Sequence, residues 1–213
     1  MTWPKLPVVV VVLAAACVPP APGTTTTTPG SAATADSAPT LVPPGLGTLK
    51  QDEVAIRLQQ LGLQVRAIPL DESIIRLLSP DSYRALGDLL RSQQGRLEEV
   101  RRRTAFAKLS VWYVSFFGIE IGEARYSPME LIITNVGRDF RPVDVIGLSP
   151  GFGRQRVRQR EVQTALYLFD GQLDVNQPLV LAYETSRSSD WTSVLETLER
   201  ERALVRSRAR GSG

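Results

Sequence analysis

Residues 109–117 read LSVWYVSFF, and this stretch decides the fold of the chain. Aromatic and β-branched residues favour strands, and a strand that is apolar on both faces is typical of the middle of a sheet. We therefore predict a central strand here, buried on both sides. The cluster of Trp112, Tyr113, Phe116 and Phe117 is expected to be core rather than a platform on which a ligand stacks.

Alternating apolar residues, bounded by turn residues, predict six more strands around this one. They are expected over residues 54–58, 63–67, 129–136, 141–148, 161–169 and 179–184. Seven such strands predict a mainly β fold with helices, in which the strands form an antiparallel β-sandwich of immunoglobulin-like architecture. The sequence lacks the Cys-Trp-Cys signature of true immunoglobulin domains, so the likeness concerns architecture alone.

Helical patterns occur in two places. A helical insertion near 71–104 is expected to contain a helix over residues 71–78, with Asp71 as its N-cap, and a second helix over residues 80–103. In that second helix, apolar residues recur at spacings of three, four and seven and so form one apolar face. A C-terminal helix is expected over residues 190–208, and the arginines of its last turns suit a helix C-terminus.

Composition limits the chemistry that the chain can perform. It has 213 residues and a formal net charge of +3, which is too small for a general nucleic-acid-binding protein. It has no His, so the commonest general base and a leading transition-metal ligand are missing. Its single Cys excludes an intramolecular disulfide and a Cys-based zinc site. We expect neither a metal nor a cofactor.

Residues 1–16 are typical of an export signal. Lys5 lies in a short basic start, an apolar run follows, and small residues stand directly before Cys17. The apolar run is too short for a membrane-spanning helix, which needs ~20 residues. Residues 13–17, LAAAC, resemble the lipobox of bacterial lipoprotein precursors, although Leu13 stands one position earlier than is usual.

This resemblance implies how the chain is processed and where it is located. Precursors of this kind receive diacylglycerol on the Cys thiol, here Cys17, are cleaved before it, and often receive a further acyl chain such as palmitate. Two or more acyl chains anchor a protein stably, so the implied location is the bacterial cell envelope. Because Val18 is not the Asp that retains enteric lipoproteins in the inner membrane, the periplasmic face of an outer membrane is favoured. The alternative is an ordinary secretory signal, with Ala14 and Ala16 forming the cleavage box.

A spacer is expected between the anchor and the folded domain. Residues 17–47 are rich in Pro, Thr, Ala, Gly and Ser and carry one charge, Asp36. Such a segment buries too little apolar surface to offset its ordering entropy, so we predict a disordered linker. Residues 48–213 are predicted to form a single β-rich domain.

The clearest local feature of this domain is a run of alternating arginines, Arg154, Arg156, Arg158 and Arg160. On a strand they would line one face, where guanidinium groups bind phosphate or carboxylate groups. These four residues are therefore candidates for anion binding. The competing interpretation is a solvated edge strand whose charge prevents edge-to-edge pairing.

The sequence shows no recognisable catalytic constellation. Acidic pairs such as Glu98 and Glu99 have no spacing that implies the two facing carboxylates of a glycosidase, and the serines have no His partner. A Ser-Lys dyad stays open, although Lys50 and Lys108 are the only lysines after the predicted cleavage point and neither lies in a recognisable motif.

These observations favour a membrane-anchored envelope lipoprotein that is a non-enzymatic interaction or structural module. Its expected partners are the membrane, through the lipid anchor, and another envelope protein or an anionic lipid or polysaccharide, whereas nucleic acid is not expected. One alternative is a hydrolase acting on cell-wall or surface polymers. Another, by analogy of fold alone, is a lipoprotein subunit of a secretion or assembly machine.

Overall fold

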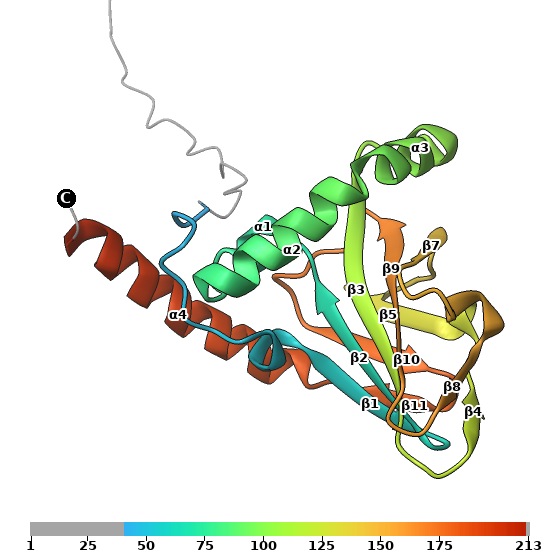
Figure 1. Cartoon of the computed structure of the whole chain (residues 1–213). Helices are drawn as coiled ribbons and strands as arrows, with labels where there is room; N and C mark the ends of the chain where they lie inside the picture. Colours follow the sequence, from blue (N-terminus) through green and yellow to red (C-terminus); the bar gives the residue numbers. More distant parts are fainter. Residues whose placement is uncertain (1–40, 212–213) are drawn as a thin grey trace, which may run out of the picture. The chain divides into compact units, whose positions relative to one another are not determined.

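A computed structural model describes residues 41–211 and shows a mixed α/β fold with antiparallel sheets and a long C-terminal helix (Figure 1). The predicted signal sequence, Cys17 and most of the predicted linker lie outside the described residues. The finer prediction, an immunoglobulin-like sandwich, stays a prediction.

The strand β3 (Leu109–Gly118) lies in the middle of a five-stranded sheet, which confirms the central position predicted for it. On one face Trp112, Val114 and Phe116 are fully buried. On the other face Tyr113 is half-buried, so burial is complete on one side of the strand only. The sheet order is β1 (Ile56–Gln60), β2 (Leu63–Pro69), β3, β9 (Val162–Asp170), β7 (Asp144–Gly147), with antiparallel neighbours throughout.

The first two strands form the hairpin that the sequence predicts. Gln60 pairs with Leu63, so Leu61 and Gly62 make a two-residue turn. Both have positive φ, 40° and 78°, as a type I′ hairpin turn requires. The first strand begins later than predicted, because Val54 ends a 3-10 helix, η1 (Gln51–Val54).

The remaining strands form two smaller sheets. Four strands of the described residues were not predicted, namely β4, β6, β8 and β11, because three residues are too few to display a period of two. The four-stranded sheet has the order β11 (Ser186–Ser188), β10 (Leu179–Tyr183), β5 (Leu131–Asn135), β6 (Arg138–Phe140). The two-stranded sheet pairs β4 (Glu123–Arg125) with β8 (Arg156–Arg158).

The helices differ from the predicted ones mainly in the insertion. The single helix expected over residues 80–103 is two helices, because the chain turns at Gln93 (φ −103°, ψ 3°). The N–H of Gln93 donates to the carbonyls of both Leu89 and Leu90, which closes the first helix, and Gly95 disfavours continuation. The bounds of the four α-helices are α1 (Glu72–Ile75), α2 (Pro80–Ser92), α3 (Gln94–Thr104) and α4 (Trp191–Gly211).

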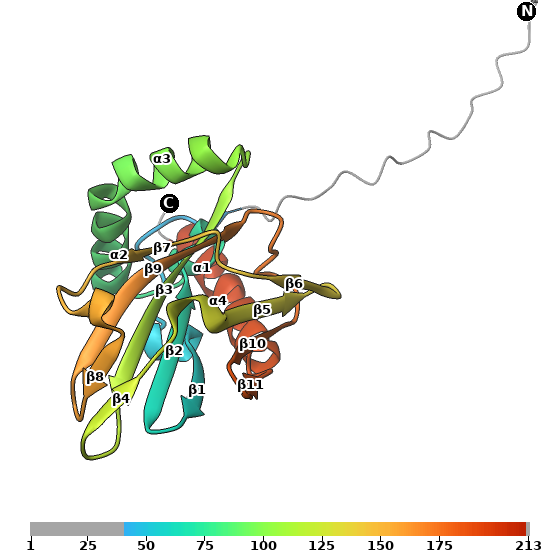
Figure 2. The same cartoon turned by 90° about the vertical axis from the view of Figure 1, so that its right-hand side faces the viewer.

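The buried face of β3 joins the larger sheets and α4 into one core. The ring of Phe116 lies 5.6 Å from that of Tyr183 in β10, and the ring of Trp112 lies 6.2 Å from that of Trp191 in α4. Figure 2 shows β5 and β10 on the same side of the domain as α4, with α2 on the other side. Trp112 and Phe116 are therefore core, as the sequence predicts, whereas Tyr113 and Phe117 are only half-buried on the other face of the strand.

Candidate functional site

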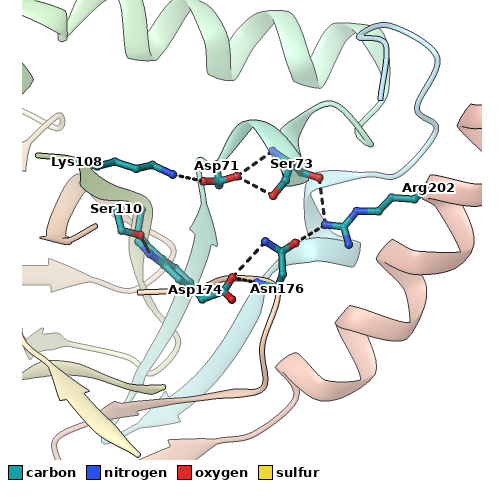
Figure 3. Close-up of polar contacts among 8 residues, drawn as sticks. Asp71, Ser73, Lys108, Ser110, Asp174, Asn176 and Arg202 are labelled. Carbon is teal, nitrogen blue, oxygen red and sulfur yellow. Dashed lines mark hydrogen bonds and ion pairs between the residues drawn. The ribbon is translucent and has the colours of Figure 1, made fainter. Parts of the chain in front are cut away.

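A pocket of about 550 Å³ lies where the inner strands β2, β3 and β9 of the five-stranded sheet begin or end. Residues 70–73 follow β2, residues 108–111 begin β3, and residues 171–176 follow β9. Because neighbouring strands are antiparallel, the ends of β2 and β9 meet the beginning of β3. We call this site the Asp71 pocket, and Figure 3 shows six of its polar residues, together with Arg202 of α4.

Gly171 lets two walls of the Asp71 pocket approach each other closely. Its N–H donates to the carbonyl of Lys108 over 3.1 Å. A Cβ atom at position 171 would lie 2.5 Å from that carbonyl oxygen, closer than real contacts allow. The turn after β9 can therefore lie beside the start of β3 only with glycine at this position.

Asp71 combines a structural role with a fixed charge. It is the N-cap of α1, as predicted, and its Oδ1 accepts from the N–H of Ser73 at 2.9 Å and from the Ser73 hydroxyl at 2.7 Å. Its Oδ2 accepts from Nζ of Lys108 at 3.2 Å (Figure 3). Burial alone would raise the pKa of Asp71, but the Ser73 hydrogen bonds and the Lys108 charge outweigh it and hold that pKa below its ordinary value. Asp71 is therefore an ionised carboxylate at neutral pH.

Lys108 pairs with this carboxylate rather than with a serine. Among residues 41–211, no hydrogen bond joins the ammonium group of Lys108 or of Lys50 to a serine hydroxyl. The hydroxyl of Ser110, which also lines the Asp71 pocket, accepts from the indole N–H of Trp112 at 3.0 Å. The Ser-Lys dyad that the sequence leaves open is thus not assembled in this part of the chain.

A buried arginine of α4 ties two walls of the Asp71 pocket together. Arg202 is 6% exposed, and its Nη2 donates to Oδ1 of Asn176 at 2.7 Å and, more weakly, to the carbonyl of Ser73 at 3.4 Å. Asn176 is held in turn by Oδ1 of Asp174, which accepts from its backbone N–H at 2.9 Å (Figure 3). The Nη1 of Arg202 donates to Glu199 at 2.5 Å. Arg202 of α4 thus bridges residues from two walls of the pocket.

The role of Arg202 was not predicted, because in the sequence it is one of the arginines of the basic helix end. A signal for that role was present. Arg202 follows Leu198 by four residues and precedes Val205 by three, so it lies on the apolar stripe of the helix. A charged residue on such a stripe indicates a buried group with partners.

The alternating arginines are only partly brought together. The expected single strand face holds for Arg156 and Arg158 of β8, between which Val157 is buried. Arg154 ends a 3-10 helix, η3 (Phe152–Arg154), and Arg160 lies in a turn with φ +62°. The strand is too short to include all four, because the chain turns on both sides of β8.

Three of these arginines line a small second pocket of about 220 Å³, which we call the Arg156 pocket. Acidic side chains offset much of its charge. Arg156 donates to Glu123 at 3.2 Å, and Glu161 accepts from the backbone N–H of Arg158 at 2.9 Å. That hydrogen bond, together with the charges of Arg158 and Arg154, holds the pKa of Glu161 below its ordinary value. The pocket thus combines three cations with two carboxylates.

Gln163 forms the floor of the Arg156 pocket and has one unused acceptor. The residue is 4% exposed, and its Nε2 donates to Glu161 at 2.5 Å. Within the described part of the chain, its Oε1 has no hydrogen-bond partner. A ligand that bound here would need a donor for this oxygen as well as an anionic group.

The remaining predicted site, the lipidation site Cys17, lies outside the described residues. In residues 41–211 no helix is long and apolar enough to span a membrane. The same residues contain no group of three or more acidic side chains placed to hold a metal ion.

Comparison with known proteins finds no matching family model, no matching curated protein and no matching solved structure.

Proposed function

We propose that the chain is a lipid-anchored envelope protein and that its domain is a non-enzymatic binding module with the Asp71 pocket as its ligand site. The anchor is supported by the signal-like residues 1–16 and by the single Cys at the position of the lipobox cysteine. The implied location is the bacterial envelope, at the periplasmic face of an outer membrane where the cell has one.

One observation carries the binding interpretation: Asp71, the most strongly held carboxylate of the Asp71 pocket, is paired with Lys108 of the same pocket. A general acid needs a raised pKa near the working pH, whereas the Ser73 hydrogen bonds and Lys108 hold the pKa of Asp71 low. Such a carboxylate offers fixed charge for recognition. Apolar residues such as Leu70, Val111 and Leu173 supply most of the remaining wall, as in typical ligand pockets.

We also propose that the two larger sheets are the layers of an immunoglobulin-like sandwich. The contact between Phe116 of β3 and Tyr183 of β10 supports this arrangement, because the two strands belong to different sheets. In sandwich domains the binding loops cluster at the strand ends, and the Asp71 pocket is formed by segments that adjoin strand ends.

The test of the binding site is crosslinking and affinity capture of the intact protein from its native membrane. Gln172 is exposed and lines the Asp71 pocket, so Gln172→Trp should fill the pocket without disturbing the core. Gln177→Trp is the matched control, because Gln177 is exposed in the same connection but does not line the pocket. We expect one stoichiometric partner that is lost with Gln172→Trp and kept with Gln177→Trp. Equal capture by both variants would reject the pocket as the binding site.

The anchor is tested separately by mass spectrometry of the mature amino terminus. We expect the mass of an acylated Cys17 and recovery of the protein in the membrane fraction. An unmodified Cys17 in a protein recovered without membrane would reject the proposal that Cys17 carries a lipid anchor.

A hydrolase is the second candidate, and one observation favours it: three carboxylates, Asp71, Glu72 and Asp174, line the same pocket. In that case Asp71→Asn and Asp174→Asn would each abolish release of fragments from purified cell-wall polymers. If the unchanged chain releases no fragments, the hydrolase is rejected.

A further inference from the structure

We propose that the C-terminal end of α4 is a membrane-docking surface, and that it binds anionic headgroups of the bilayer in which the lipid on Cys17 is inserted. The inference rests on the proposed anchor and adds an orientation of the domain to it. The surface consists of Arg206 and Arg210 together with residues 41–43, and we call it the α4 basic surface.

The charge of this helix end is strongly one-sided. Residues 200–211 contain five arginines and one glutamate. Two of the arginines serve the fold, because Arg202 is buried and Arg208 donates to Glu201 at 2.8 Å. The other three, Arg200, Arg206 and Arg210, are exposed, and no carboxylate of residues 41–211 lies within ion-pairing distance of any of them. Arg200 donates to the hydroxyl of Thr197 on the same helix, which leaves Arg206 and Arg210.

Arg206 and Arg210 are not explained by a stabilising effect on the helix. Like charges four residues apart are neighbours on a helix surface and weaken it slightly. The helix dipole favours cations only in the last turn, which contains Arg210 but not Arg206. The helix therefore gains little stability from these two cations, which stay available to an anionic partner.

The segment that leads to the anchor is fastened to the same part of α4. The backbone N–H and the hydroxyl of Thr48 both donate to Oε1 of Glu201, at 2.9 and 3.0 Å. Arg208 donates to the carbonyl of Leu46 at 2.8 Å. Figure 1 shows this first described segment running along α4 toward the C-terminal end of the helix.

At the end of this segment, residues 41–43 lie against the arginines themselves. Together with Arg206, Ala209 and Arg210 they line a shallow pocket of about 330 Å³. Leu41 is 46% exposed there, so an apolar side chain accompanies the two cations. Two unpaired cations of the domain therefore lie where the polypeptide leaves toward Cys17.

Because of this placement, the anionic groups nearest to the α4 basic surface are expected to be the headgroups of the bilayer. Only 24 peptide bonds separate Cys17 from Leu41, a reach of at most about 85 Å, and residues 18–40 contain no Lys or Arg. A tether of this length keeps the helix end at a high local concentration near the membrane. Each arginine close to an anionic surface strengthens binding by about fivefold.

The test uses the chain from residue 17 onward with Cys17→Ser, so that no lipid is attached, and vesicles of equal parts phosphatidylglycerol and phosphatidylcholine. We expect binding that weakens as salt rises, because exposed charges are screened, and no binding to phosphatidylcholine alone. Arg206→Gln with Arg210→Gln should weaken binding by about 25-fold, the product of two fivefold effects.

The matched control removes two exposed arginines from α3, Arg96→Gln with Arg102→Gln, and so lowers the net charge equally. Figure 1 shows α3 far from the C-terminal end of α4. We expect this variant to bind within about twofold of the parent, since its charges do not face the bilayer. Equal loss in both double variants, or no loss in the Arg206 and Arg210 variant, would overturn the proposal.

A second readout locates the contact. Cys17 is the only cysteine, so Cys17→Ser allows a single dye to be attached at Ser207→Cys on α4 or at Ser92→Cys on α2, both exposed positions. Quenching by headgroup-labelled lipid should occur at position 207 and not at position 92. Quenching at 92 alone would place the contact elsewhere and reject the α4 basic surface.

These outcomes are separate from those of the proposed anchor. An unmodified Cys17 in cells would reject the anchor while leaving vesicle binding by α4 measurable. Acylated protein whose unlipidated form ignores anionic vesicles would keep the anchor and reject the docking surface.

Discussion

Arg202 and Arg206 lie one turn apart on α4, but their environments differ sharply. Arg202 is 6% exposed, reaches Asn176, Glu199 and the Ser73 carbonyl, and holds the walls of the Asp71 pocket. Arg206 is exposed and has no carboxylate partner within residues 41–211.

The comparison separates charges that the fold uses from charges that it leaves available. A buried polar group without partners is strongly destabilising, so its presence inside a domain indicates a structural role. An exposed charge contributes little to stability, so it stays available to solvent or to a partner. Arginines on the same helix therefore differ in role: Arg202 stabilises the fold, and Arg206 does not.

The largest expected effect is on stability, from Arg202→Ala. Loss of the buried guanidinium removes packing and leaves Asn176 without its donor, so the free energy of unfolding should fall by about 2–3 kcal/mol. Arg206→Ala is the matched control and should change it by less than about 0.5 kcal/mol. Denaturant unfolding of the two variants measures both values. Similar values would show that Arg202 and Arg206 do not differ in their contribution to stability.

A smaller effect is expected from Glu201→Gln. Glu201 is 4% exposed and accepts from Thr48 and Arg208. A neutral amide weakens these charge-assisted bonds, so stability should fall by about 1–2 kcal/mol. Hydrogen exchange should speed up at the Thr48 amide and stay unchanged in β3. Unchanged protection of Thr48 would show that other contacts hold the segment on α4.

A pH-dependent effect is expected from Asp71→Asn. Because the folded-state pKa of Asp71 lies below its ordinary value of about 3.9, its charge stabilises the fold above that value and this contribution disappears as the pH falls through the lowered pKa. Asn can still cap α1, and Lys108 is 70% exposed, so the loss at pH 7 should be below about 1 kcal/mol. The free energies of unfolding of the unchanged chain and of Asp71→Asn should differ at pH 7 and become equal at acid pH. A difference that does not change with pH would contradict a stabilising charge on Asp71.

The smallest effect is expected from replacing the alternating arginines Arg154, Arg156, Arg158 and Arg160 by Gln. Glu123 and Glu161 already offset much of their charge, so vesicle binding by the unlipidated chain should change by no more than about twofold. A loss larger than that of the Arg206 and Arg210 variant would move the membrane contact to the Arg156 pocket.

Local patterns predicted much of the secondary structure. The run of residues 109–117 indicates a central strand because its side chains suit a pleated, buried surface. Gln60-Leu61-Gly62 indicates a turn because glycine adopts positive φ without strain. The break at Gln93 was not predictable in this way, because Leu97 and Val100 continue the apolar spacing across it.

The pockets were not predictable from local patterns. Asp71 was identified as an N-cap, but its pairing with Lys108 depends on the register of β2 and β3, which brings residues 37 positions apart together. The alternating arginines suggested one strand face, whereas the turns around β8 keep only two on a strand and place Glu123 of β4 against them.

By itself the sequence determined the central strand, the first hairpin, the cap of α1 and the resemblance of residues 13–17 to a lipobox, because each of these depends on neighbours in the chain. The tertiary structure decided the long-range pairs, whereas pairs three residues apart on one helix, such as Glu98 with Arg101, are local. Pairing across 37 residues at Asp71, or across 153 residues between Thr48 and Glu201, is fixed by sheet register and helix packing. Those long-range contacts, and not composition, distinguish the arginine that supports the fold from the arginines that remain free to bind.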